Sequence, residues 1–296
     1  MTKLEIFYSN VITSVERHEY LQNNFASCNF KPHWTLNRFV SLDANNPAVQ
    51  SMPGALGIGG KGAYLSELEI LRQCLGHDCH TMVMEDDFQF CPKSQQVIDF
   101  VLGGMTDDSW DLLFTDTIIP NAIDMPRFLY ERRIYEQTGN ITILSLPVKP
   151  YRTMSGTVIV NKASRQKILD LMSVDDLSIP WDVLMGSHIA SGAVRAFLIF
   201  PFATCPSLLA DRSTLQALDN EGYVSAEHAE NLRGRLEHAL HNDFSRMIWV
   251  GREDDAFFAT DPLSRFGDLS KFSRPDVERM CEIMKPLLGV MMRYPS

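Results

Sequence analysis

Short apolar segments alternate with longer amphipathic segments over roughly the first two thirds of this chain. The apolar segments have the length of buried strands, and they lie at 4–8, 30–40, 81–84, 111–114, 154–161 and 196–200. The amphipathic segments repeat apolar residues three and four positions apart, as one face of a helix does. They begin near Ser14, Gly59, Lys93, Lys162 and Ile179. Because strands and helices alternate, we expect an α/β fold with a mostly parallel central sheet.

The alternation fades after about residue 213. The ranges 226–241 and 274–292 are amphipathic and carry no clear strand pattern. In a chain of 296 residues we therefore expect an α/β domain over 1–213 and a helical C-terminal extension over 214–296 that packs on it. The alternative for the apolar face of 274–292 is docking on a membrane surface or on a second subunit.

The charge balance narrows the range of partners. The chain carries 27 Lys and Arg against 37 Asp and Glu, a formal net charge of −10. This acidic balance disfavours nucleic acid as a binding partner. For an anionic ligand we therefore expect a bound cation, with a local basic pocket as the alternative. The longest apolar stretch, 196–205, is about half of what a bilayer requires, and the N-terminal residues have no signal-peptide pattern. We expect a cytoplasmic protein without a transmembrane segment.

The cysteines do not follow a metal-binding pattern in the sequence. The six cysteines are scattered, and Cys74, Cys79 and Cys91 come closest to a cluster without forming a Cys-x-x-Cys pair. We therefore expect reduced, partly buried thiols rather than a zinc site.

One apolar strand segment runs directly into three consecutive acids. Thr81–Met84 is followed by Glu85, Asp86 and Asp87. Three adjacent carboxylates repel one another unless they are solvated or share a cation, and Mg²⁺ and Mn²⁺ prefer oxygen ligands. In an extended segment Glu85 and Asp87 point to one side and Asp86 to the other. The two readings are a divalent-cation site and a solvated acidic turn in which an Asp caps a helix.

The segment from Gly59 to Asp87 resembles glycosyltransferase family 25, the lipopolysaccharide and collagen β-galactosyltransferase-like family. That family carries a Gly-Glu-Ile-Gly-Cys-x-x-Ser-His helix start, followed by an apolar strand that ends in Glu-Asp-Asp. In this chain Gly59, Gly62 and Ser66 match the helix start, and the acidic triplet follows at the end of the strand. The family Glu is Gly60 here, and the family His is Glu67.

Further pieces of the family pattern occur in order over about residues 4–210. They are Asn10 after the first strand, Glu16-Arg17 at the first helix, Trp110-Asp111-Leu112, Gly156-Thr157 and Pro180-Trp181-Asp182.

The resemblance implies a GT-A fold and a hexosyltransferase. It would transfer a sugar, commonly galactose, from a UDP-sugar with inversion, with Mn²⁺ or Mg²⁺ as cofactor. The acceptor would be a glycan such as lipopolysaccharide or a lipid-linked precursor at the inner face of the membrane. The implied donor-binding residues are Asn10, Arg17, Ser66, Glu85 and Asp86. The implied metal ligands are Asp87 and Glu85.

Two acids are candidates for the base that takes the acceptor proton. We expect Asp182, because the resemblance places the Pro180-Trp181-Asp182 element in the acceptor half of a GT-A domain, and Trp181 beside it could stack on a sugar. Asp116 is the rival. Lys61 is a further candidate to offset diphosphate charge. The alternative function is a glycosyltransferase-like protein without activity, acting in glycan binding or assembly, and the departures at Gly60 and Glu67 motivate it.

Overall fold

The structure is a computed structural model that describes residues 2–117, 125–146, 156–211, 242 and 245–251. The strands are β1 Leu4–Asn10, β2 Trp34–Val40, β3 His80–Glu85, β4 Phe88–Gln89, β5 Leu112–Phe114, β6 Thr142–Leu146, β7 Thr157–Val160, β8 Ala196–Phe200 and β9 Cys205–Pro206. The helices are α1 Val15–Ser27, α2 Pro47–Ser51, α3 Ile58–Gln73, α4 Pro92–Gly104, α5 Met125–Thr138, α6 Arg165–Met172 and α7 Trp181–Ala190, with short 3-10 turns η1 Lys162–Ser164 and η2 Leu208–Asp211.

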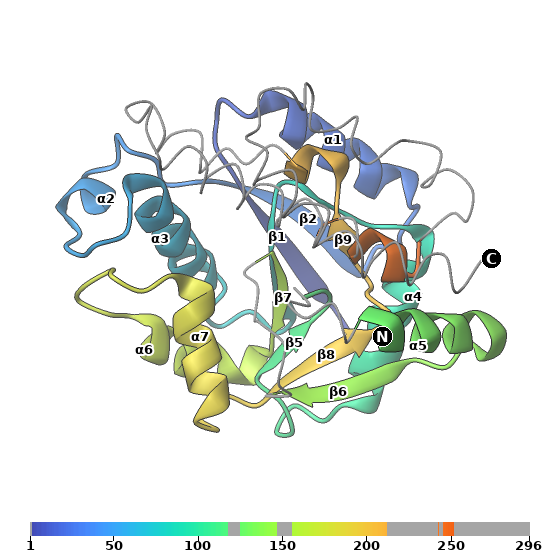
Figure 1. The fold of residues 1–296 in the computed structure, drawn as a ribbon. Helices are drawn as coiled ribbons and strands as arrows, with labels where there is room; N and C mark the ends of the chain where they lie inside the picture. The colour runs from blue at the N-terminus through green and yellow to red at the C-terminus, as the bar shows by residue number, and fades with distance from the viewer. Residues whose placement is uncertain (1, 118–124, 147–155, 212–241, 243–244, 252–296) are drawn as a thin grey trace, which may run out of the picture.

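A seven-stranded sheet forms the centre of the molecule, in the order β2-β1-β3-β7-β5-β8-β6 (Figure 1). The pairs β1–β2, β1–β3 and β5–β8 are parallel, and the pairs β3–β7, β5–β7 and β6–β8 are antiparallel. It follows that β7 and β6 run against the other strands of the sheet. The expected α/β fold with a mostly parallel central sheet is confirmed.

The strand order reverses its direction of growth beside β1. The chain places β2 on one side of β1 and then returns to place β3 on the other side. In open α/β sheets such a switch point leaves a crevice at the carboxyl ends of the two central strands, where ligands collect. Ser9 and Asn10 end β1, and Glu85 ends β3, so these polar residues meet at the crevice.

Helices cover both faces of the sheet, and each face has its own apolar core. Along β1 the side chains of Leu4, Ile6 and Tyr8 are fully buried in the core that includes residues of α1 and α4. Phe7, which points to the other face, packs on the core formed with α3, α6 and α7. Figure 1 shows α3, α6 and α7 on one side of the sheet and α1 and α4 on the other.

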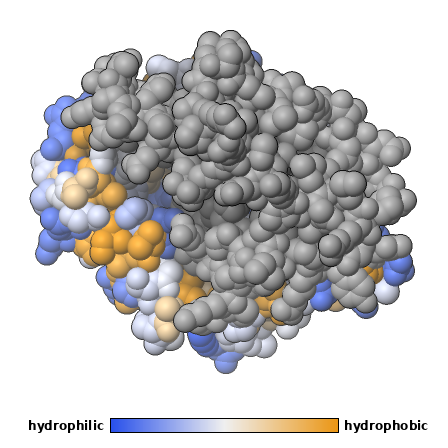
Figure 2. Space-filling view, in the orientation of Figure 1, coloured by the Kyte–Doolittle hydropathy of each residue, from blue (hydrophilic) through white to orange (hydrophobic). Residues whose placement is uncertain are grey.

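Several elements have no counterpart among the expected ones, namely α2, α5, β4, β6 and β9. The segment that contains α2 reads as a loop, because it is rich in Asn, Pro and Gly. The expected extension over 214–296 lies outside the described residues, apart from 242 and 245–251. Figure 2 shows hydrophobic surface on the α3 and α7 side of the described part of the molecule. Ile179 and Val183, at the start of α7, are among the exposed hydrophobic residues.

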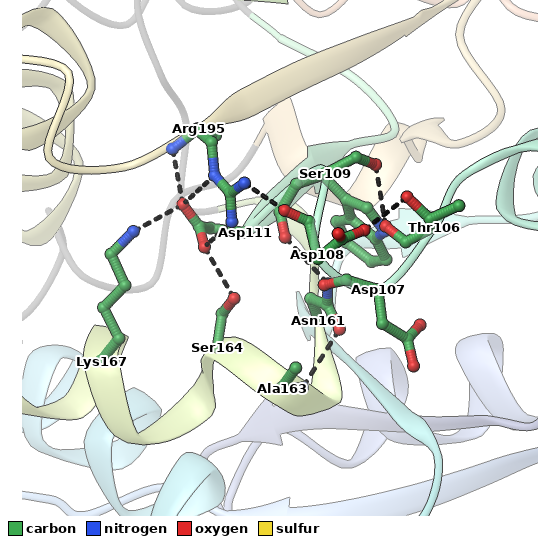
Figure 3. A network of polar contacts seen from close by, with 11 residues as sticks. Thr106, Asp107, Asp108, Ser109, Asp111, Asn161, Ala163, Ser164, Lys167 and Arg195 are labelled. Carbon is green, nitrogen blue, oxygen red and sulfur yellow. Dashed lines mark hydrogen bonds and ion pairs between the residues drawn. The ribbon is translucent and has the colours of Figure 1, made fainter.

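A polar network closes the amino end of β5 (Figure 3). The carboxylate of Asp111 accepts hydrogen bonds from the Lys167 amine and the Ser164 hydroxyl, each at 2.7 Å. It also accepts from the backbone N–H of Arg195 at 2.7 Å and from its guanidinium at 3.2 and 3.3 Å. These contacts tie β5 to α6 and to the start of β8.

Candidate functional site

A pocket of about 310 Å³ occupies the crevice at the carboxyl ends of β1 and β3. Ligand sites of small molecules begin at about this size. The N-terminus of α3 also borders it, through Ile58 and Gly59, and Arg17 reaches it from α1. Its acidic lining residues are Asp43, Glu67, Glu85, Asp86 and Asp87.

Gly62 explains how α3 can lie against the loop that follows β2. A Cβ at this position would lie 2.2 Å from the backbone carbonyl oxygen of Leu42, so a side chain would force the helix away from the loop. Leu42, Asp43 and Ile58 all line the pocket, and the pocket wall therefore depends on this close approach.

Asp86 is held on both carboxylate oxygens. Its Oδ2 accepts a hydrogen bond from Asn10 Nδ2 at 2.5 Å, and its Oδ1 accepts from Arg17 Nη1 at 3.0 Å. Asn10 in turn accepts from Arg38 Nη2 on β2 at 2.6 Å. The ends of β1, β2 and β3 and the helix α1 are thus joined through one acid, which gives Asp86 a positioning role in the pocket wall.

Asp87 has one paired oxygen and one unpaired oxygen. Its Oδ2 lies 2.9 Å from Arg17 Nη1, whereas its Oδ1 is buried and has no hydrogen-bond partner among the residues that the structure describes. Burial raises the pKa of Asp87 to about 6; Arg17 opposes this rise and Asp86 adds to it. A bound cation is one way to satisfy a buried carboxylate oxygen that lacks a hydrogen-bond partner.

Asp116 follows the carboxyl end of β5 and is fully buried. Neither of its carboxyl oxygens meets hydrogen-bond geometry with any described residue, although the nearby Ser245 hydroxyl lowers the pKa in part. Burial raises the pKa of Asp116 to about 8, and the charges of Glu85 and Asp87 raise it further. Asp116 is therefore largely protonated at neutral pH in the absence of a cation.

Glu67 connects the acidic triplet to Asp182. This α3 residue is buried, and its Oε2 has no partner within the described ranges. Burial raises the pKa of Glu67 well above its usual range, and the charges of Glu85 and Asp182 raise it further. Glu67 and Asp182 also line a common small cavity beside Trp181. The charges of Glu85 on β3 and Asp182 on α7 consequently both act on Glu67 of α3.

Three threonines close a ring of hydroxyls behind the triplet. Thr115 donates to Thr157 at 2.9 Å, and Thr204 lies 2.8 and 2.9 Å from these two hydroxyls. All three are fully buried, on the end of β5, the start of β7 and the loop after β8. The ring satisfies polar groups that would otherwise be costly to bury beside Asp116.

Of the residues expected to bind a donor, Asn10, Arg17, Glu85 and Asp86 come together at the crevice. Ser66 does not, and this expectation needs correction. Its hydroxyl donates to the Gly62 carbonyl at 2.7 Å and accepts from the Leu42 N–H at 2.8 Å, so it is fully buried between helix and loop.

Two other candidate side chains make contacts within the protein itself. The Lys61 amine donates to the Met52 carbonyl at 2.8 Å, so it fastens a loop rather than offsetting ligand charge. The Trp181 ring is buried and packs edge-on against Tyr64 with ring centroids 5.0 Å apart, so it does not offer a face to a sugar. Asp182, in the first turn of α7, is only partly buried.

No role at the site was predicted from the sequence for three residues around it, namely Arg38, Glu67 and Arg246. Arg38 lies mid-strand in β2, where a charged residue carries no motif. Arg246 donates to the carbonyls of Pro206, at 2.9 Å, and Ser207, and the Ser207 N–H donates to the Asp87 carbonyl at 2.7 Å. In the sequence, Glu67 stood out only because it replaces the His of the family pattern.

The donor set at the triplet fits a hard cation. The polar side chains that line the pocket at and after the end of β3 are the carboxylates of Glu85, Asp86 and Asp87, and Asp87 Oδ1 has no hydrogen-bond partner among the described residues. Among the described residues, one group of three Asp, Glu, His or Cys side chains has all its ligand atoms within 4.8 Å of one another. That group does not include a residue of the acidic triplet. The triplet therefore suits a cation held by one or two carboxylates with the rest of its shell from ligand and water, as is usual for Mg²⁺.

In the described part of the chain, each helix is too short or too polar to cross a bilayer. No protein-family model matches the chain, and no curated protein matches it in sequence. The chain is similar to the crystal structure of mouse xyloside xylosyltransferase 1 in its apo form, at 8% identity and a TM-score of 0.33, with 63% of this chain and 82% of that chain covered. A likeness at this level carries no argument about chemistry, so the site is characterised by its own geometry.

Proposed function

We propose that this chain is a metal-dependent glycosyltransferase of the family 25 type. It would transfer a hexose, with galactose the first sugar to test, from a UDP-sugar to a glycan or lipid-linked glycan acceptor. The proposal includes a GT-A type fold, an inverting reaction and a cytoplasmic location at the inner face of a membrane.

One observation carries the proposal. Asn10, Arg17 and the acidic triplet come from three separate segments, and they meet on one pocket at the carboxyl ends of β1 and β3. The sequence resemblance names the same residues for donor binding. A ribose and a diphosphate require hydrogen-bond acceptors and positive charge at such a place. Arg17 and the N-terminus of α3 supply positive potential there.

Asp87 and Glu85 would hold a divalent cation, whose charge neutralises the diphosphate as it leaves. Asp86 is already held by Asn10 and Arg17, so it contributes a fixed acceptor beside the ribose rather than a flexible one. Arg17 places its guanidinium between Asp86 and Asp87 and remains beside the diphosphate.

In an inverting transfer the acceptor oxygen forms a bond to the anomeric carbon while the bond to the diphosphate breaks on the opposite face. The acceptor hydroxyl proton goes to a carboxylate. Asp182 is our choice for this base, because it is partly accessible at the start of α7. Asp116 is fully buried, so an acceptor hydroxyl reaches it less readily.

One observation favours the alternative of a protein that binds the nucleotide sugar without turning it over. The Arg17 guanidinium contacts both Asp86 and Asp87, so its positive charge already neutralises part of the triplet. A site neutralised in this way could bind a donor without a metal and without catalysis.

The deciding experiment measures UDP release by the full-length chain with a panel of UDP-sugars and candidate acceptors, with Mn²⁺ and with a chelator. We expect release with at least one sugar and its loss on chelation. Donor binding by calorimetry is measured in parallel. Intact UDP-sugar binding without turnover for any sugar would favour the inactive binding protein, and absence of both would contradict the proposed function altogether.

A further inference from the structure

A second group of potential metal ligands lies at the amino end of the sheet, away from the pocket. It consists of Glu5 on β1, Cys74 at the end of α3 and His77 in the turn before β3. Their ligand atoms lie within 4.8 Å of one another, and His77 Nδ1 lies 2.7 Å from Glu5 Oε2. The three residues come from two segments that the parallel pairing of β1 with β3 brings together.

The loop that carries Cys74 and His77 is fixed by a buried cation. Arg165, on α6, is almost fully buried, and its guanidinium donates to the carbonyl of Cys74 at 2.6 Å, to that of His77 at 2.9 Å and to that of Cys79. Gly76 completes the turn with a φ of +85°. Ligands on a backbone held in this way lose little conformational freedom on binding, which favours a preorganised site.

The chemistry of the three side chains suits a borderline transition metal. A thiolate, an imidazole and a carboxylate are the ligand types that Zn²⁺ takes, and a thiolate does not suit Mg²⁺ or Mn²⁺. Tetrahedral zinc with bonds of about 2.0–2.3 Å places its ligand atoms roughly 3.5 Å apart. The observed limit of 4.8 Å therefore requires only a small movement of the side-chain ends.

Burial and access also agree with metal binding. The Cys74 side chain is fully buried, so the sulfur side of the site is closed to solvent. The side chains of His77 and Glu5 are 44% and 30% exposed, which gives an ion a way in and leaves a position for water.

We propose that Glu5, Cys74 and His77 bind one Zn²⁺-class ion, with water as the fourth ligand, and that this ion clamps the end of α3 to β1. The site differs in kind from the acidic triplet, because it includes sulfur and nitrogen. It is also independent of the proposed transferase function.

The test uses the full-length chain, stripped of metal by a chelator, and titrates it with Co²⁺ alone as a spectroscopic probe. We expect one Co²⁺ per chain to give a thiolate-to-metal absorption band and visible bands of four-coordinate cobalt, which Zn²⁺ then abolishes. Co²⁺ at the acidic triplet would have only oxygen ligands and no thiolate band, so the readout separates the two sites.

His77→Ala and Glu5→Gln should each weaken Co²⁺ binding at this site at least tenfold, and both residues are exposed enough for the variants to fold. The matched control is His33→Ala, because His33 forms a similar pair with Asp99 at 2.7 Å that is not part of the three-ligand group. This control should leave the thiolate band unchanged. A folded wild-type chain without a thiolate band, or a band that His77→Ala does not weaken, would overturn the proposal.

Discussion

A buried aspartate lies at each end of strand β5, and the surroundings of the two shift the carboxyl pKa in opposite directions. Asp111, before the strand, accepts hydrogen bonds from Arg195, Lys167 and Ser164, which outweigh burial and hold its pKa well below the usual range (Figure 3). Asp116, two residues after the strand, has no hydrogen-bond partner for either oxygen among the described residues, and burial raises its pKa to about 8.

The difference contrasts the two ends of β5. At the amino end, the Asp111 carboxylate is paired with Lys167 and Arg195, so these polar groups serve stability. At the carboxyl end acids outnumber cations, and buried oxygens of Asp87, Asp116 and Glu67 lack hydrogen-bond partners in the described part of the chain. Perturbed acids of this kind collect where a ligand or ion completes the structure.

The largest expected effect is on activity, from Asp87→Asn. Because this change removes charge from the proposed metal ligand, Mn²⁺-supported UDP release should fall about a thousandfold or more, equivalent to several kcal/mol. The fold should remain intact, since an amide is no harder to bury there than a carboxylate with a raised pKa. Melting temperature and UDP release are measured together, with the exposed Asp170→Asn on α6 as the matched control. Wild-type activity in Asp87→Asn would contradict the metal site.

Asp182→Asn should lower turnover by at least about a hundredfold, because a general base acts in the transition state. The apparent affinity for the UDP-sugar should change little. Steady-state kinetics separate kcat from KM. Equal losses in donor binding and turnover would instead place Asp182 in donor binding and return Asp116 to consideration as the base.

Asp111→Asn tests the other end of β5. Removing one partner from a buried ionic network leaves uncompensated groups, so the free energy of unfolding should fall by about 3 kcal/mol. Arg195 and Lys167 are nearly half exposed and can regain water, which keeps the loss at the lower end of the range. Chemical denaturation measures this change. A neutral result would show that the network of Figure 3 is not needed for stability.

Asp116→Asn should have the opposite sign. Between a pKa of about 3.9 in the unfolded chain and about 8 in the folded one, the folded protein binds more protons, so its stability falls as pH rises through that range. The variant should gain on the order of 2 kcal/mol at pH 8 in metal-free buffer and show a shallower decline from pH 5 to pH 8. Denaturation at several pH values measures both. A loss of stability at pH 8 would mean that Asp116 is ionised and paired.

The sequence predicted the strands and helices wherever the apolar pattern is strong. β1 and α3 are examples, because each has one buried face that sets its period, and β3 and β8 are examples because each is a short, almost continuously buried apolar run. β6 was not predicted from the sequence, because only its final residue, Leu146, is buried and its other side chains are exposed or half-exposed. Such a strand is defined by its pairing with β8, which no local pattern records.

For the site, the sequence located the residues that adjoin strand ends. Asn10 and Asp86 follow apolar runs directly, and the parallel sheet brings those ends together. Arg38 and Arg246 could not be found this way, because their roles depend on contacts with Asn10, Pro206 and Ser207 across the fold. The predicted roles of Asp87, Asp182 and Asp116 stay predictions that the variants above test.

The threonine ring has a consequence for how mutations there combine. Each hydroxyl of Thr115, Thr157 and Thr204 lies within hydrogen-bond distance of the other two, and a hydroxyl can both donate and accept. A single change to valine leaves the other two with a broken ring and unmatched groups, whereas a triple change removes every polar atom at once. The three substitutions should therefore be strongly non-additive, with the triple variant less damaged than the sum of the singles. In a chain that has lost one of these hydroxyls, loss of the other two should increase stability. We therefore expect the three positions to change together.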